Sequence, residues 1–189
     1  LRDAAVVIRG GRIAAIGPRA GVTWPRDLDV VSVDGMTIVP GLWDMHTHVT
    51  QVEWAPVYLG AGVTTVRDMG NEFEFITALR RAVSSGRALG PRLLAAGLID
   101  GGGANAFGVY DAATPDEGRQ WVRTYHDAGF EQIKVYMQLA PPVVEAIRDE
   151  AHRLGMTVTG HVPASMTLES VVTAGMDQIA HLPIRGEAG

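Results

Sequence analysis

The spacing of apolar and polar residues changes near residue 40 of this 189-residue chain. Before that point, short apolar runs are separated by glycine turns, as in Val6-Val7-Ile8, Gly10-Gly11 and Ile13-Ala14-Ala15-Ile16. A second turn, Asp34-Gly35, separates the apolar residues 30–33 from 36–39. Short apolar runs bounded by such turns are typical of β-hairpins. Residues 1–40 are therefore expected to form part of a small β-sandwich domain.

From residue 41 onward, apolar runs of strand length alternate with longer amphipathic segments. Thr114, Pro115 and Glu117 have the spacing of a helix start with a capping box. Alternation of strands and helices predicts parallel strands joined by crossover helices. The strand candidates are residues 41–46, 63–68, 92–98, 131–136, 156–161 and 177–181, and the helix candidates are residues 53–60, 72–85, 115–128, 141–154 and 167–174.

Six strand candidates of this kind predict an incomplete (β/α)8, or TIM, barrel over residues 41–189. A closed barrel has eight strands and about 250 residues. The predicted fold class is α/β: a partial TIM barrel with about six of the eight βα units, preceded by the partial β-sandwich. We expect the chain to be a fragment of a longer protein.

Composition restricts the kind of partner that the chain can bind. A hydrophobic content of 47% with 20% charged residues is typical of a globular protein. The net charge of -5 argues against nucleic acid and anionic membranes as partners, and no apolar stretch is long enough to span a membrane. A small-molecule substrate is the expected partner, and a homo-oligomer of the full-length protein is left open. Because no targeting segment is recognisable, the cytoplasm is slightly favoured, although the chain opens at Leu1 rather than at Met.

Four of the six histidines, His46, His48, His161 and His181, fall at the carboxyl ends of predicted strands. TIM-barrel active sites are built at that face of the barrel. A single histidine at a strand end is ordinarily a hydrogen-bonded polar residue, but four at one face favour a metal site. Because the chain has no cysteine, its metal ligands would be histidines, carboxylates or a modified side chain.

Lys134 is the one lysine among 16 basic residues, and it lies within a predicted strand. One interpretation makes it the partner of a structural ion pair. The other is that the site requires a primary amine, which can react with carbon dioxide to give a carbamate. A carbamate is an anionic oxygen ligand able to bridge two cations, and arginine cannot form one.

These residues belong to longer segments that resemble the metal-dependent amidohydrolase superfamily. Within it, the chain is similar to the branch that contains imidazolonepropionase-like and prolidase-like enzymes, and Lys134 favours the binuclear, prolidase-like side. The matching segments are Val-Pro-Gly-Leu-Trp-Asp-Met-His-Thr-His at residues 39–48, Gly-Val-Thr-Thr-Val-Arg-Asp at 62–68, Ile-Lys-Val-Tyr at 133–136, Thr-Gly-His-Val at 159–162 and Gln-Ile-Ala-His at 178–181.

The resemblance implies two divalent metal ions, expected to be Zn²⁺, and a carbon dioxide-derived carbamate on Lys134 that bridges them. It implies that His46 and His48 bind the more buried ion and that His161 and His181 bind the more exposed one. The family's general base is an aspartate of the eighth strand. We expect that residue to be absent from this chain, so no catalytic residue is assigned. Tyr136 and Arg67 are expected to contact the substrate.

The implied activity is hydrolysis of C–N bonds, in amides, cyclic amides or dipeptide-like substrates, by water activated at a binuclear metal site. The fragment itself is expected to be inactive without the late-strand aspartate. Two alternatives remain open. One is a non-catalytic fragment or scaffold with the same fold. The other is a related hydrolase that acts on esters, lactones or phosphotriesters.

Overall fold

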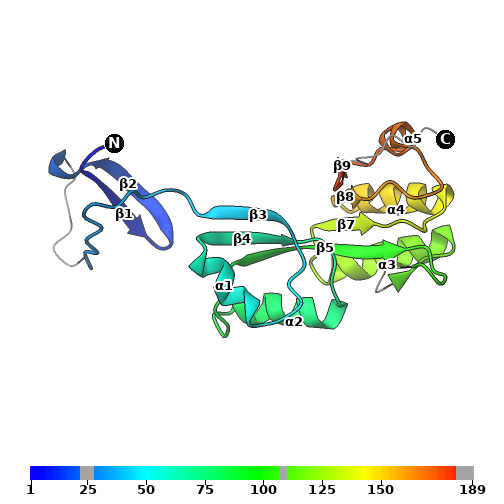
Figure 1. The fold of residues 1–189 in the computed structure, drawn as a ribbon, viewed down its shortest axis with the longest axis horizontal. Coiled ribbons are helices and arrows are strands. Elements are labelled where there is room, and N and C mark those ends of the chain that lie inside the picture. Colours follow the sequence, from blue (N-terminus) through cyan, green and yellow to red (C-terminus); the bar gives the residue numbers. More distant parts are fainter. Residues whose placement is uncertain (22–27, 107–109, 182–189) are drawn as a thin grey trace. The chain divides into compact units, whose positions relative to one another are not determined.

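The computed structural model describes residues 1–21, 28–106 and 110–181 and divides into two compact units, Leu1–Val39 and Pro40–Gly189. In the smaller unit, β1 (Ala4–Arg9) and β2 (Arg12–Pro18) form an antiparallel hairpin, followed by the short 3-10 helix η1 (Arg19–Gly21) (Figure 1). The hairpin turns at Gly10-Gly11, as predicted, and both glycines have positive φ angles.

Residues 30–33 and 36–39 do not form the strands that were predicted for them. The turn between them does form, and the amide of Met36 donates a hydrogen bond to the carbonyl of Val33 at 2.9 Å. Val30, Val31 and Met36 are largely exposed. A strand needs a partner and an apolar face that other residues cover, and the described part of this unit offers these residues neither. The turn was therefore predicted correctly and its flanking strands were not.

The larger unit is built on a curled parallel sheet that forms half of a barrel, with the strand order β3-β4-β5-β7-β8-β9 (Figure 1). The predicted α/β class and partial TIM barrel are confirmed. The short strand β6 (Tyr110–Asp111), which pairs with β5, was not predicted. The six main strands are β3 (Leu42–Thr47), β4 (Val63–Asp68), β5 (Arg92–Asp100), β7 (Gln132–Val135), β8 (Thr157–Gly160) and β9 (Gln178–Ile179).

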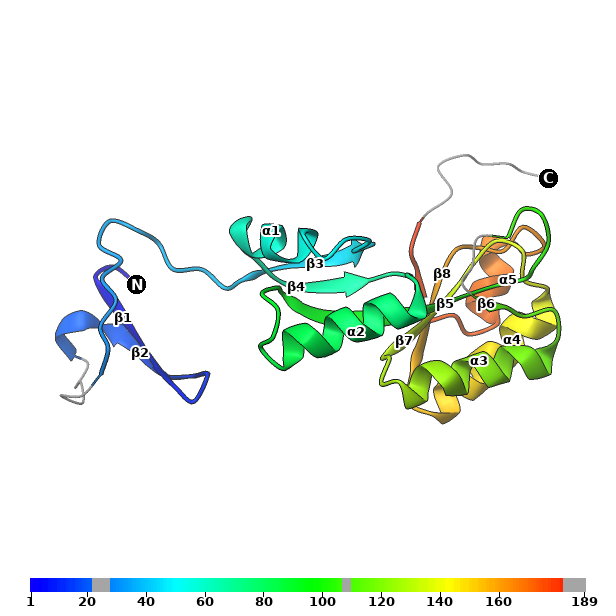
Figure 2. The same cartoon turned by 90° about the horizontal axis from the view of Figure 1, so that it is seen from below.

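Helices follow the strands as the alternation predicted, and α2, α3 and α4 line one side of the curled sheet in Figure 2. The capping box of α3 is present: the Thr114 hydroxyl accepts from the amide of Glu117, and the Glu117 carboxylate accepts from the amide of Thr114. In the described part of the chain, no helix is long and apolar enough to cross a membrane. The helices are α1 (Trp54–Gly60), α2 (Phe73–Ser84), α3 (Pro115–Asp127), α4 (Pro141–Arg153) and α5 (Leu168–Thr173).

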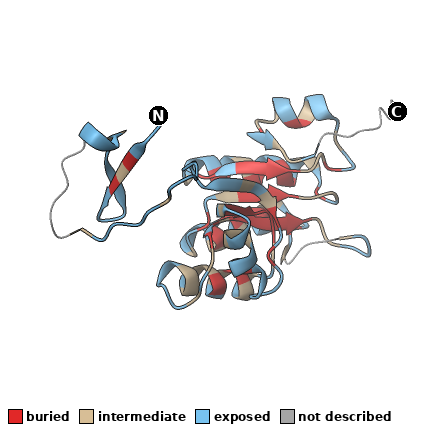
Figure 3. Cartoon of the chain, turned by 60° about the vertical axis from the view of Figure 1, so that its left-hand side comes forward, coloured by how far each residue is buried: buried red, intermediate tan, exposed pale blue. Residues whose placement is uncertain are grey.

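The core of the larger unit lies between the sheet and these helices, and Figure 3 shows buried residues concentrated along the strands. β5 and α3 approach each other closely at Gly97. A Cβ atom added to Gly97 would lie 2.3 Å from Cγ of Tyr125. Tyr125 is fully buried, and its hydroxyl donates to the carbonyl of Leu98 at 3.0 Å. Glycine at position 97 therefore sets the distance between sheet and helix.

A charged cluster joins α3 to α4 at the outer surface. The Glu150 carboxylate, whose side chain is 9% exposed, accepts hydrogen bonds from Arg153 at 2.6 Å and from Arg123 at 2.9 Å. These bonds, that of Arg153 above all, hold the pKa of Glu150 at about 2. The ionised carboxylate is therefore stabilised in the folded chain.

We predict that Gly97→Ala lowers the free energy of unfolding by about 1–3 kcal/mol, because the added methyl group must displace the Tyr125 ring. Urea denaturation of the full-length protein measures this change. Gly60→Ala is the matched control, because a Cβ atom there meets nothing within 4 Å. Equal stability of the Gly97→Ala variant and the wild type would contradict the close packing of β5 against α3.

A second prediction concerns pH. The pKa of Glu150 is lower in the folded chain than its ordinary value of 4.5, so its contribution to stability is full above about pH 4.5 and is lost as the pH falls through about 2. Glu150→Gln should cost about 1 kcal/mol at pH 7, because both arginines are half-exposed and solvent screens them. The cost should shrink as the pH falls from about 4.5 and vanish below about pH 2. Glu145→Gln, at an exposed position of α4, should change stability by less than about 0.5 kcal/mol. A pH-independent effect of Glu150→Gln would refute this account.

Candidate active site

The histidines singled out in the sequence all lie at one edge of the half-barrel. His46 is near the end of β3 and His48 lies just beyond it, while His161 follows β8 and His181 follows β9. Lys134 lies within β7, between the paired residues Leu98 of β5 and Thr159 of β8. Because the strands are parallel, their carboxyl ends meet at the same edge. The fold therefore brings these five residues to one side of the sheet.

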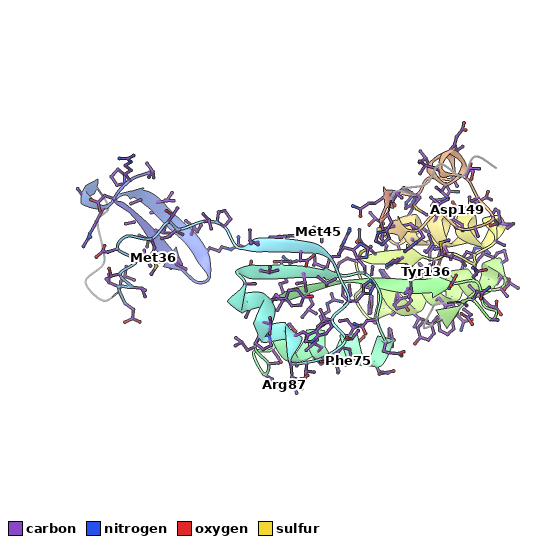
Figure 4. All side chains as sticks on the ribbon, in the orientation of Figure 1. Met36, Met45, Phe75, Arg87, Tyr136 and Asp149 are labelled. Carbon is purple, nitrogen blue, oxygen red and sulfur yellow. The ribbon has the colours of Figure 1, made fainter. Side chains whose placement is uncertain are left out.

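The four imidazole rings form a continuous row. Ring centroids are separated by 5.5 Å between His48 and His46, by 4.6 Å between His46 and His181, and by 4.8 Å between His181 and His161. The ring of Tyr136, labelled in Figure 4 just beyond β7, extends the row and lies 4.4 Å from that of His161. Imidazole nitrogens from three separate strands are thus gathered in one place.

Two of these histidines are held in the neutral form. Burial, and then the positive charge of Lys134, lower the pKa of His46 and that of His161 from 6.5 to about 4. At neutral pH each of these rings therefore carries a nitrogen lone pair. A neutral imidazole is the form that binds metal ions.

Lys134 is buried, with 2% of its surface exposed. Burial is the main cause that lowers its pKa from 10.5 to about 8, the cation of Arg67 adds to the decrease, and Asp68 opposes it. Its Nζ atom lies 5.9 Å from the ring centroid of Tyr136. A larger fraction of this amine is neutral at pH 7 than of an exposed lysine, and a neutral amine is a nucleophile.

The backbone next to His161 depends on Gly160. A Cβ atom at this position would lie 2.1 Å from the carbonyl oxygen of Val135, and the φ angle of Gly160 is 142°. This approach allows the amide of His161 to donate to the same carbonyl at 3.1 Å. Glycine thereby places His161 beside the end of the strand that carries Lys134.

Arg67, a predicted substrate contact, is 7% exposed. Its guanidinium donates to the carbonyl of Met45 at 2.7 Å and to the side-chain oxygens of Gln178 at 2.6 Å and Gln132 at 3.2 Å. It therefore joins four strands. It also borders a half-open pocket of about 220 Å³ next to Gln132 and Thr157, the first residues of β7 and β8. A contact with substrate stays a prediction for Arg67, as it does for Tyr136.

Two buried aspartates at this edge were not recognised as part of the site from the sequence. Asp68 and Asp100 are the last residues of β4 and β5 and are 1% and 0% exposed. Burial raises the pKa of Asp68. Asp100 accepts hydrogen bonds from the amides of Gly101 at 2.8 Å and Gln138 at 2.7 Å. An aspartate that closes an apolar strand at the catalytic face is the signal that could have identified both.

The donor types present suit a divalent metal such as Zn²⁺, which binds imidazole nitrogen and anionic oxygen. Across residues 1–21, 28–106 and 110–181, no group of three or more His, Asp or Glu side chains is arranged so that it could hold a metal ion. The four histidines instead form the row described above, with the buried Lys134 close enough to influence His46 and His161. Any ion at this site would therefore need further ligands besides these histidines, and Lys134 is a candidate.

Comparisons with known proteins connect this arrangement with a family, although no family model matches the chain. The chain is 31% identical over 86 residues to N-substituted formamide deformylase of Arthrobacter pascens. The matched segment covers 44% of the chain and 16% of that protein. It is 52% identical over 48 residues to imidazolonepropionase of Micrococcus luteus, which covers 25% of the chain and 12% of that protein.

Among solved structures, a candidate prolidase from Bifidobacterium longum superposes with a TM-score of 0.77 and 28% identity, over 89% of the chain and 46% of that structure. The chain thus spans less than half of that protein, and the matched segments span far less of the two curated relatives. The half-barrel, the sequence segments around the histidines and these likenesses agree. Together they support the assignment of the chain to the amidohydrolase superfamily.

Proposed function

We propose that the protein containing this chain is a metal-dependent hydrolase of C–N bonds in amides, cyclic amides or dipeptide-like substrates. The observation that carries the proposal is the row of four imidazole rings beside the buried Lys134. The activities named for the relatives support it, because a formamide deformylase, an imidazolonepropionase and a candidate prolidase all act on C–N bonds. A small-molecule substrate is the proposed partner.

Two divalent ions, most simply Zn²⁺, would be held by the two histidine pairs. His46 and His48 would hold one ion, His161 and His181 the other, and a carbamate on Lys134 would lie between them. When bound, such cations lower the pKa of water and polarise the carbonyl group of a substrate.

The chain's own residues would prepare this site in two ways. The low pKa values of His46 and His161 keep their rings neutral, so that binding a cation displaces no proton from either ring. The pKa of Lys134, about 8, makes the neutral amine available to attack carbon dioxide. In that step the lone pair of Nζ would form a bond to the carbon of carbon dioxide while one C=O π bond opens onto oxygen. One proton would pass from the nitrogen to solvent, leaving an anionic carbamate.

The edge of the sheet also offers a place for a substrate. Tyr136 is half-buried next to His161, so we propose that its ring contacts the bound substrate. The guanidinium of Arg67 already donates hydrogen bonds to Met45, Gln132 and Gln178. We therefore propose that Arg67 acts on the substrate through its positive charge more than through direct contact. No residue of the described part is assigned as the general base.

The metal site is tested by the metal content of the full-length protein. We predict about two equivalents of Zn²⁺ in the wild type, as binuclear hydrolases hold, and fewer than about one in Lys134→Ala, because both ions lose the shared ligand. His126→Ala is the control, since this exposed residue lies on α3 and its loss should leave both equivalents in place. One equivalent in the wild type and in Lys134→Ala alike would refute the carbamate bridge.

The bond that is cleaved is tested with a panel of N-acyl amino acids, proline dipeptides, hydantoins, lactones, esters and phosphotriesters. We predict turnover of at least one of the three C–N classes by the zinc-loaded wild type, and a loss of at least about 100-fold in kcat/KM for Lys134→Ala, comparable to the removal of other groups that stabilise the transition state. Turnover confined to lactones, esters or phosphotriesters would reassign the reaction. A metal-loaded protein without turnover would favour a scaffold.

A further inference from the structure

Asp68 connects the segments that follow two neighbouring strands. It ends β4 and is 1% exposed. Its carboxylate accepts hydrogen bonds from the amide of Val49 at 2.8 Å, from the amide of Gly70 at 3.1 Å and from the side-chain amide of Asn71 at 3.1 Å. Val49 follows His48 in the chain, so Asp68 holds the backbone on the carboxyl side of this histidine.

Gly70, whose amide is bound by Asp68, also contacts the ring of His48. The carbonyl oxygen of Gly70 lies 2.7 Å from Nδ1 of His48. A carbonyl oxygen can only accept a hydrogen bond, so Nδ1 must carry the hydrogen. In a neutral ring the lone pair is then left on Nε2.

Further bonds fix the same segment on both sides of His48. The side-chain amide of Asn71 donates to the carbonyl of Val49 at 2.7 Å. The amide of Met69 donates to the carbonyl of Thr47 at 2.8 Å. The residues before and after His48 are therefore both hydrogen-bonded to the segment that follows β4. Asp68 is the charged group of this hydrogen-bond network.

We infer that Asp68 is a positioning residue: through the backbone of Gly70 it sets the tautomer and orientation of His48 and leaves Nε2 as the ligating nitrogen. The importance of that nitrogen for metal binding rests on the proposed function, but the tautomer is a property of the chain itself. A group that accepts a hydrogen bond from the non-ligating nitrogen of a histidine orients the ring and affects how tightly the histidine binds a metal.

Asparagine at position 68 would break this arrangement with almost no change in volume. A carboxylate offers an acceptor to Val49 on one oxygen and to Gly70 on the other. A side-chain amide has only one oxygen, so in either orientation its NH₂ group would face one of these two backbone amides. Asp68→Asn should therefore release either the Gly70 carbonyl or the segment after His48.

Asp177→Asn is the matched control. The Asp177 carboxylate accepts from the amide of Val158 at 2.7 Å, near the start of β8 and thus at the opposite edge of the same sheet. The variant makes the same Asp-to-Asn change at a carboxylate that accepts from a backbone amide, and this carboxylate also lies 2.9 Å from Nε2 of His152, a histidine on α4. It should leave the environment of His48 unchanged.

The test is ¹⁵N NMR of histidine-labelled full-length protein without metal, followed by Zn²⁺ affinity measured against a competing chelator. In the neutral ring of His48 we expect the hydrogen on Nδ1, both in the wild type and in Asp177→Asn. In Asp68→Asn we expect a mixture of tautomers and Zn²⁺ binding that is about 10–100-fold weaker.

If Asp68→Asn does not fold, the wild-type spectrum alone still tests the inference. A hydrogen on Nε2 of His48 and none on Nδ1 would overturn it. A folded Asp68→Asn variant with unchanged tautomer and unchanged Zn²⁺ affinity would also overturn it. A tautomer that shifts in Asp68→Asn while even the wild type binds no Zn²⁺ would support the positioning role and contradict the proposed metal function.

Discussion

Parallel pairing of neighbouring strands is the constraint on which the rest of this structure depends. Hydrogen bonds between β7 and β8 set Lys134 beside Thr159, and those between β8 and β9 set Gly160 beside Ile179. Because every strand of this sheet runs in the same direction, residues far apart in the sequence arrive at one edge of the sheet. A shift of one residue in this register would turn side chains to the other face and disperse the site.

Burial then gives the assembled side chains their chemical character. Removing His46, His161 and Lys134 from water disfavours their charged forms, which lowers the pKa values of all three. The same burial would be costly for Arg67 and Asp68, but backbone carbonyls, glutamine side chains and backbone amides supply hydrogen bonds to these charges. The interior therefore combines neutral nitrogen donors with fixed charges that hold the surrounding segments in place.

Most of this fold could be predicted from the sequence because each βα unit is specified locally. Apolar runs of strand length marked all six main strands, and Thr114 with Glu117 marked the start of α3 by a capping box that forms as expected. Interactions between distant residues explain the failures. Residues 30–33 and 36–39 have strand-like sequences, but the described chain offers them no partner. The strand β6 has only two residues, too few to show a period.

The candidate site could be predicted in the same way, and with a similar limit. Histidines at strand ends can be recognised in the sequence, because their position relative to an apolar run predicts at which edge of the sheet they lie. The role of Asp68 is not visible, because it depends on backbone amides from a different loop. Whether hydrogen bonds of this kind form is decided by the path of the chain after β3, which no local pattern specifies.

The central claim is that this row of histidines and Lys134 form one binuclear centre. It is tested most directly by anomalous diffraction at the zinc edge from crystals of the full-length protein grown with Zn²⁺ and bicarbonate. The account predicts two anomalous peaks, one at the His46–His48 pair and one at the His161–His181 pair, with carbamate density on Nζ of Lys134 between them. Zinc bound elsewhere, together with an unmodified Lys134 amine, would contradict it.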